Sequence, residues 1–295
     1  MIRILGTIFV GLLGLAFGSF LNVCLSRWPA GESVVQPRSH CRQCGRTLTW
    51  WENVPLLSWL ALRGRCRTCR AWIGWRYPLV ELVVGTLWGL VAWRFLDWAF
   101  LPGVPELAFF RGLVMLVGHL VFYWLLVTLA VLDAEHLWLP NWLTWPAIAI
   151  GFTYSSVPLP FDDVVALASW GTSIQIRAAI ASILAMSIAA GLILLIRWVY
   201  WLIRRREGIG LGDAKLMAML AAWLGLPCAL LAFGLGVVLG ALVAVVLLAI
   251  PSDRDNTETW ALKKMPLGTF LCVGGIVSSL WGQPIIAAYQ RWAGF

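Results

Sequence analysis

The sequence predicts an all-α polytopic membrane protein with about eight transmembrane helices and a small tetracysteine insertion between the first two. Hydrophobic residues make up 61% of its 295 residues and charged residues only 12%, about half the charged fraction of an ordinary soluble domain. Several apolar runs are long enough to cross a hydrocarbon core of about 30 Å as helices. The chain also contains 20 tryptophans, and indole rings collect at membrane interfaces.

The apolar run over residues 4–24 predicts the first helix. Its glycines, at positions 6, 11, 14 and 18, suit close packing against another helix. No small-residue cleavage site follows the run, so we expect the helix to remain uncleaved. Residues 1–26 therefore form the first of three predicted domains.

The second predicted domain, residues 27–77, is a polar and arginine-rich module. It holds four of the seven cysteines as two Cys-x-x-Cys pairs, which are separated by 21 residues. The pairs are Cys41 with Cys44 and Cys66 with Cys69. Four thiolates complete a tetrahedral metal shell, so this spacing predicts a structural zinc ribbon. Two disulfides are the alternative, which a cytoplasmic location disfavours.

The third predicted domain, residues 78–295, contains seven further apolar segments that each predict a membrane helix. These segments are 78–95, 112–132, 142–157, 178–202, 214–226, 229–250 and 270–290. Pro78 suits a first helical turn, where Glu81 would complement the helix dipole. The 214–226 helix is short, about 20 Å, and we expect Pro227 to end it.

The loop charges predict the orientation in the membrane. Basic residues gather in residues 27–77, around Arg204 and around Lys263, which alternation of the helices places on one side. Acidic loops, including the one with Asp162 and Asp163, fall on the other side. Because positive loops stay in the cytoplasm, we expect the cysteine module there. This distribution accounts for the net charge of +8 without a nucleic-acid partner.

A Gly-x-Gly-Asp element precedes the short 214–226 helix. It consists of Gly210, Gly212 and Asp213, followed by Lys215. Glycines there let the backbone turn tightly. An ionisable residue beside the bilayer core is a functional candidate by default, but an ordinary helix N-cap is an equally good interpretation of Asp213. A second acid has to decide between the two interpretations.

Asp133 is that second acid. It follows the predicted 112–132 helix, 80 positions before Asp213, at the same predicted membrane face. Two carboxylates that approach each other do not both ionise freely, so one serves as a base and the other as an acid. Such a pair can activate water and protonate a scissile amide, which is aspartic proteolysis. Glu135 and His136 are near rivals, and we expect both to face the cytoplasm.

Several motifs along the chain match one family together. They are Gly18-Ser19-Phe20-Leu21-Asn22-Val23, both cysteine pairs, Arg76-Tyr77-Pro78-Leu79-Val80-Glu81, Leu132-Asp133 leading to Leu139-Pro140, Gly210-Leu211-Gly212-Asp213-Ala214-Lys215-Leu216, and Pro266-Leu267-Gly268-Thr269-Phe270-Leu271. On these motifs the chain resembles the bacterial prepilin peptidases, which are membrane aspartic proteases of the Gly-x-Gly-Asp class. The resemblance covers nearly the whole chain.

The resemblance implies that Asp133 and Asp213 are catalytic and that Gly210, Gly212 and Lys215 form the active-site loop. It implies removal of the leader of type IV prepilins or pseudopilins at the cytoplasmic face of the bacterial inner membrane, in type IV pilus assembly or type II secretion. Many members also N-methylate the new terminus with S-adenosylmethionine. The residues that would bind this cofactor stay unknown, since no nucleotide-binding loop is visible and the cysteine module looks too small.

The chain departs from the family pattern in two places. Asn141 stands where the family usually has Asp, while Leu267 and Thr269 stand where it usually has Phe and Pro. We expect peptidase activity to survive these changes.

The alternative function is a membrane scaffold or regulator whose zinc ribbon docks a partner, without peptidase activity. It differs from the enzyme because it would tolerate substitution of both aspartates. A transporter is a weaker alternative, since paired halves with broken helices are missing. The oligomeric state is not predicted by the sequence.

Overall fold

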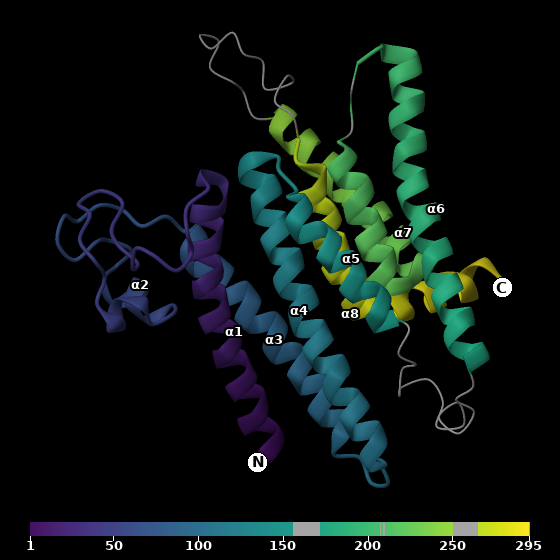
Figure 1. Ribbon diagram of the computed structural model, residues 1–295, viewed down its shortest axis with the longest axis horizontal. Helices are drawn as coiled ribbons and strands as arrows, with labels where there is room; N and C mark the ends of the chain where they lie inside the picture. Colours follow the sequence, from purple (N-terminus) through teal and green to yellow (C-terminus); the bar gives the residue numbers. More distant parts are fainter. Residues whose placement is uncertain (156–171, 207, 209, 250–264, 295) are drawn as a thin grey trace. The chain divides into compact units, whose positions relative to one another are not determined.

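The computed structural model of the chain is almost entirely helical (Figure 1). It describes residues 1–155, 172–206, 208, 210–249 and 265–294, and within these ranges no β-strand forms. The chain divides into two compact units, Met1–Thr128 and Leu129–Phe295. The predicted all-α fold with a tetracysteine insertion after the first helix is confirmed for the described residues.

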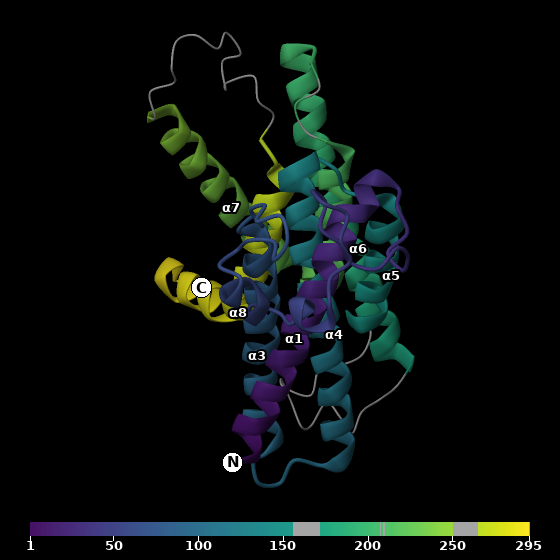
Figure 2. The ribbon, with the colours of Figure 1, turned by 90° about the vertical axis from the view of Figure 1, so that its left-hand side faces the viewer.

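Unit 1 is built on two long helices that lie side by side, α1 (Ile2–Arg27) and α3 (Arg76–Ala99) (Figure 2). A Cβ atom at Gly18 would lie 2.7 Å from the Cα atom of Glu81, and one at Gly14 would lie 2.9 Å from the Cα atom of Gly85. Such distances leave no room for a side chain. The predicted packing role of the glycines in the first helix is therefore confirmed at these positions.

The cysteine module joins α1 to α3 and contains little regular structure. It holds two short 3-10 helices, Trp28–Ala30 and Trp50–Asn53, and the five-residue α2 (Leu57–Ala61). The first part of α4 (Glu106–His136) completes unit 1. Trp88 of α3 anchors it by donating its indole N–H to the carbonyl of Leu120 at 3.0 Å.

The predicted role of Glu81 as a partner of the helix dipole is wrong. Helix α3 begins at Arg76, two residues before Pro78, so Glu81 lies beyond the first turn. Its buried carboxylate instead accepts a hydrogen bond from the backbone N–H of Leu56, at 2.8 Å. Glu81 therefore connects α3 to the cysteine module.

Unit 2 contains the end of α4 and four further helices: α5 (Asn141–Ser155), α6 (Thr172–Arg204), α7 (Leu211–Ala249) and α8 (Leu267–Ala293). Helix α7 packs against α5, α6 and α8. Trp223 of α7 donates its indole N–H to the carbonyl of Ala147 in α5 at 2.9 Å. The ring lies where a side chain at Gly151 would be, so glycine is needed at that position.

Six helices in the described part of the chain are long and apolar enough to cross a membrane, namely α1, α3, α4, α6, α7 and α8. The sequence predicts about eight, and two features explain the difference. Helix α5 has only 15 residues, about 22 Å of rise. The predicted helices 214–226 and 229–250 correspond to the two parts of α7, which share one label although the non-helical Gly225 separates them.

The predicted break between the 214–226 and 229–250 helices is present, but it lies at Gly225, two residues before Pro227. Gly225 adopts φ 74° and ψ 168° inside α7, a conformation that is open to glycine. The irregularity therefore falls just before the proline, which cannot donate a helical hydrogen bond, and the helix resumes afterwards. The predicted acidic loop with Asp162 and Asp163 and the basic loop with Lys263 lie outside the described residues.

Candidate active site and metal centre

The end of α4 and the start of α8 meet at Asp133, whose side chain is 6% exposed. Its Oδ2 atom accepts the backbone N–H of Thr269 at 2.7 Å, and the Thr269 hydroxyl lies 3.3 Å from the same oxygen. The backbone N–H of Gly268 also points to this carboxylate. These N–H groups belong to the first turn of α8, where a helix has no internal acceptor for them. The carboxylate of Asp133 thus caps α8, a helix whose bonded residue Thr269 lies 136 positions later in the sequence.

Asp213 is the third residue of α7 and is 8% exposed. Its Oδ2 atom accepts the backbone N–H of Gly210 at 3.1 Å. This arrangement matches the acid of a capping box, which bonds back to the residue before the helix. The N-cap interpretation of the sequence is therefore close to the local structure, but it accounts for only one oxygen of a buried carboxylate.

The two carboxylates come together within unit 2. The side chain of Leu139 lies against Gly212, the neighbour of Asp213, and against Gly268, which borders Oδ2 of Asp133. The two carboxylates are close enough for the charge of Asp133 to act on Asp213. Helices α4, α7 and α8, which are far apart in the sequence, thus meet around the two acids.

Leu139 explains why glycines flank the acids. A Cβ atom at Gly212 would lie 3.1 Å from Cδ1 of Leu139, and one at Gly268 would lie 3.2 Å from the same atom. A Cβ atom at Gly268 would also lie 2.9 Å from Oδ2 of Asp133. Larger residues at these positions would crowd the Leu139 side chain, and at position 268 also the carboxylate of Asp133.

Lys215 and Asn141 form a second link near the pair. The ammonium group of Lys215, one turn into α7, donates to the side-chain carbonyl of Asn141 at the start of α5. An aspartate at position 141 would accept from the same ammonium group. Asn141 therefore offers Lys215 a neutral acceptor where an aspartate would form an ion pair. The connection between α5 and α7 is kept.

The four module cysteines form a compact cluster. The sulfur atoms of Cys41, Cys44, Cys66 and Cys69 all lie within 4.8 Å of one another. The sulfur atoms of Cys41 and Cys69 are 3.7 Å apart, against about 2.05 Å in a disulfide. A tetrahedral ion with bonds of about 2.3 Å to sulfur needs edges of about 3.8 Å. The cluster can therefore hold a metal ion.

The two halves of the cluster repeat one backbone pattern. In the first, the N–H of Gly45 donates to the carbonyl of Cys41 at 2.8 Å; in the second, the N–H of Arg70 donates to the carbonyl of Cys66 at 3.0 Å. Gly45 and Arg70 both have positive φ, and each half is flanked by an isolated antiparallel bridge. The N–H groups of Cys69 and Thr68 point to the sulfur of Cys66 and lower the pKa of its thiol to about 6, which favours the thiolate that a metal requires.

The comparisons with known proteins cover both units. A family profile described as "Bacterial Peptidase A24 N-terminal domain" matches residues 12–95, and one described as "Type IV leader peptidase family" matches residues 120–245. A prepilin leader peptidase/N-methyltransferase of Stutzerimonas stutzeri is 33% identical, over 95% of this chain and 92% of the relative. The chain belongs to the type IV leader peptidase family.

Other relatives of this leader peptidase carry the same name. The protein of Pseudomonas aeruginosa is 32% identical, over 96% of this chain and 93% of the relative. The protein of Myxococcus xanthus is 38% identical, over 88% of this chain and 68% of the relative. No solved structure gives a significant match. Together with the six spanning helices, the relatives make the chain a multi-pass membrane protein.

The sequence predicts that the two aspartates lie together and that the four cysteines lie together. The structure has both groups. The sequence prediction misses the supporting groups, above all Thr269, Gly268 and Leu139. The Pro266–Leu271 motif was a signal for them, but nothing in it indicates that Asp133 is its partner. Of the near rivals, Glu135 is exposed and lies 3.8 Å from His136.

Proposed function

We propose that this chain is a prepilin leader peptidase, an aspartic endopeptidase in which Asp133 and Asp213 activate water. The observation that carries the proposal is the meeting of these two buried carboxylates from α4 and α7 within unit 2. The family profile for leader peptidases spans both positions, since it covers residues 120–245. Gly210, Gly212 and Lys215 form the active-site loop around Asp213.

The carboxylate pair supplies both proton transfers of peptide hydrolysis. One carboxylate is ionised and removes a proton from water, whose oxygen forms a bond to the carbonyl carbon of the scissile amide. The other carboxyl, which holds a proton, donates it to the carbonyl oxygen. When the tetrahedral species collapses, the C–N bond breaks and the departing amine takes up the proton that came from water.

The substrate is the N-terminal leader of a type IV prepilin or a pseudopilin, as the names of the relatives indicate for those proteins. We place the enzyme in the bacterial inner membrane with the cysteine module and the acid pair facing the cytoplasm. The basic residues of the module support this orientation.

The same names include N-methyltransferase activity, and we extend this activity to the chain. S-adenosylmethionine, when bound, would supply the methyl group for the new terminal amine.

The metal of the tetracysteine cluster is proposed to be zinc. A shell of four thiolates at near-tetrahedral separations suits Zn²⁺ and leaves no position for a reacting water. The zinc would therefore hold the module together and take no part in hydrolysis.

Replacement of either acid by its amide tests the peptidase. Asp133→Asn and Asp213→Asn should each lower the rate of prepilin cleavage at least about 100-fold, because each removes one of the two proton transfers. The rate is measured by mass spectrometry of a prepilin incubated with membranes that contain each variant.

Glu135→Gln is the matched control, since Glu135 is an exposed acid one half-turn from Asp133 on α4. It should retain the wild-type cleavage rate. If either aspartate variant cleaved normally while inserted in the membrane, the acid pair would not be the catalyst. The alternative function, a membrane scaffold or regulator, would then be favoured.

A further inference from the structure

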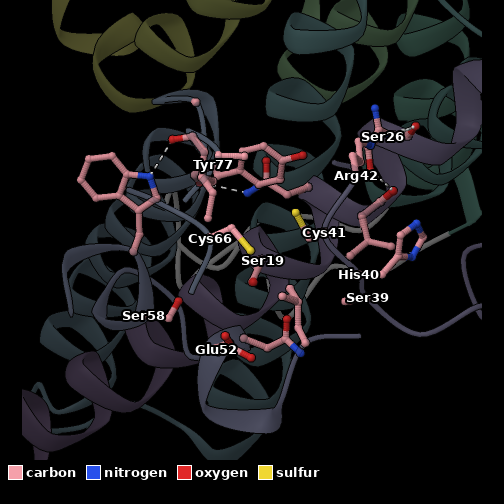
Figure 3. A pocket seen from close by; sticks show the side chains of 18 of the residues that line it. Ser19, Ser26, Ser39, His40, Cys41, Arg42, Glu52, Ser58, Cys66 and Tyr77 are labelled. Carbon is pink, nitrogen blue, oxygen red and sulfur yellow. Dashed lines mark hydrogen bonds between the residues drawn. The ribbon is translucent and has the colours of Figure 1, made fainter. Parts of the chain in front are cut away.

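The short helix α2 of the cysteine module has two different faces. One face borders a cavity of about 660 Å³ that lies between α1, the start of α3 and the module. Ser58 and Trp59 line this cavity, and Figure 3 shows Ser58 at its edge. Leu57 and Leu60, three positions apart, share the other face of α2 and are 65% and 63% exposed. The outward face of α2 is therefore apolar.

Three tryptophans of the module form an ordered aromatic cluster beside α2. The rings of Trp59, Trp72 and Trp75 contact one another, with centroids 4.5 to 5.9 Å apart. The indole N–H of Trp59 donates to the carbonyl of Ile73 at 3.1 Å, which fixes the ring. Trp72 and Trp75 are nevertheless 54% and 66% exposed, as indoles at an interaction surface are. We call the following residues the tryptophan patch: Leu57, Leu60, Trp59, Trp72 and Trp75.

A hydrogen bond fixes the level of α2 along the membrane-spanning helix α3. The backbone N–H of Leu56, the residue before α2, donates to the carboxylate of Glu81 at 2.8 Å. Glu81 follows Arg76, the first residue of α3, by five positions, or about 7.5 Å of helix. Figures 1 and 2 both show α2 beside α1 and α3, at a height between the two ends of these helices. The patch therefore lies at the level of the membrane interface.

Helix α3 continues this exposed apolar surface towards the bilayer. Trp75 is the N-cap of α3, and Leu79 and Leu82 follow it by four and seven positions, which places all three on one helix face. Leu79 and Leu82 are at least half exposed, so this face of a spanning helix contacts lipid. The ring of Trp75 lies 4.5 Å from that of Trp59. The patch is therefore continuous with a lipid-facing surface.

Arginines give this part of the module a positive charge. Residues 57–76 contain five arginines and no acidic residue. Arg65 forms an isolated antiparallel bridge with Trp72, and directly opposed residues of such a pair present their side chains on one face. Arg63 and Arg65 are both exposed. Indoles settle at the level of lipid headgroups, and arginines beside a membrane are attracted to anionic headgroups.

We propose that the tryptophan patch, with Arg63 and Arg65, binds the anionic phospholipid surface of the bilayer that the chain spans. This contact holds the cysteine module, with its metal cluster, against the membrane. A second copy or a soluble protein fits the patch less well, because lipid already surrounds α3 at this level. The proposal does not rest on the peptidase activity, since all of its residues belong to unit 1.

The depth of residue 60 in the bilayer tests the proposal. Leu60→Cys is labelled with a nitroxide in the full-length, metal-loaded protein, and wild-type protein treated in the same way gives the background from the native cysteines. Oxygen concentrates in lipid, whereas a nickel chelate stays in water. In bilayers of phosphatidylcholine and phosphatidylglycerol, the ratio of oxygen to chelate collisions should be at least about threefold higher for this label than for one at Glu32→Cys. Glu32 is the matched control, because it is an exposed acid beyond the end of α1.

The arginines test the charge of the surface. Arg63→Gln combined with Arg65→Gln should raise the collisions of the label at residue 60 with the chelate at least about threefold. Bilayers of phosphatidylcholine alone should have the same effect on protein that keeps both arginines. Arg38→Gln removes an exposed arginine outside residues 57–76 and should leave the depth unchanged. Metal content and melting temperature establish that each variant is folded.

Three results would contradict the proposal. Equal collisions with the chelate at residues 60 and 32 would mean that the patch lies in water. Exclusion of both oxygen and the chelate from residue 60 would mean that protein covers the patch, and dipolar broadening between labels would then identify a second copy. A label that stays immersed in neutral bilayers and without both arginines would overturn the choice of an anionic surface.

Discussion

Asp133 is positioned by a residue that sequence comparison alone would call a deviation. Thr269 occupies the position where the resemblance of the Pro266–Leu271 motif leads to an expectation of proline, and its backbone N–H donates to Asp133 at 2.7 Å. Proline has no N–H and could not make this bond. The Thr269 hydroxyl lies 2.9 Å from the carbonyl of Ala130, which ties α8 to the helix that carries Asp133. This chain therefore holds Asp133 more firmly than a proline at 269 would allow.

Thr269→Pro should lower kcat for prepilin cleavage about tenfold, because one charge-assisted hydrogen bond of about 1.5–3 kcal/mol is lost at a positioned carboxylate. KM should change little, since Thr269 is a positioning residue and is not expected to touch the leader. Thr269→Val keeps the N–H and loses only the hydroxyl, so its kcat should stay within about threefold of the wild type. Steady-state kinetics on a purified prepilin measure both constants. Equal effects of the two variants would show that the N–H is not what matters.

At the scale of elements, the module is held by one buried acid as well as by its cysteines. Glu52 lies in the 3-10 helix Trp50–Asn53 and forms a capping box with Thr49. Arg46, just after the first cysteine pair, donates to its Oε1 atom at 2.5 Å. Burial by itself would raise the pKa of Glu52, but the hydrogen bonds from Arg46 and Thr49 outweigh it and lower this pKa to about 2.

A lowered pKa means that Glu52 stabilises the folded module in its ionised form. This contribution is complete above the unfolded pKa of about 4.3 and is lost as the pH falls from about 5 to about 2. The melting temperature of the wild type should therefore exceed that of Glu52→Gln at pH 7, and the gap should close with acidification. Comparing the two proteins at each pH cancels the release of metal by acid, which affects both. A gap that stayed constant down to pH 2 would contradict this role.

The elements also explain how far the sequence predicts the structure. Hydropathy locates the long helices because twenty or so apolar residues have few alternatives in a membrane. It places the break in α7 at Pro227 instead of two residues earlier at Gly225, because hydropathy does not indicate which glycine adopts a positive φ. The acid pair is predicted because motif and topology agree. The contact of Thr269 with Asp133 spans 136 positions, and no residue next to either one in the sequence predicts it.

The acid pair and the metal cluster belong to different units of the chain. The acid pair, its helix contacts and the Lys215 link lie within Leu129–Phe295, while the metal cluster and the cavity lie within Met1–Thr128. Cys41 and Cys66 belong to the cluster and also line the cavity. A bound metal would therefore fix two walls of that cavity.

Removal of the metal should accordingly affect the two units unequally. Protein stripped by a chelator should lose the folded cysteine module, because the loops 41–46 and 66–71 lose their shared anchor. Its cleavage of prepilin should change by less than about threefold, since the acid pair needs no ion. Limited proteolysis of the module and mass spectrometry of the cleavage product, on the same sample before and after zinc is restored, give both values. A parallel fall in cleavage and in protection of the module, reversed together by zinc, would mean that the module also serves hydrolysis.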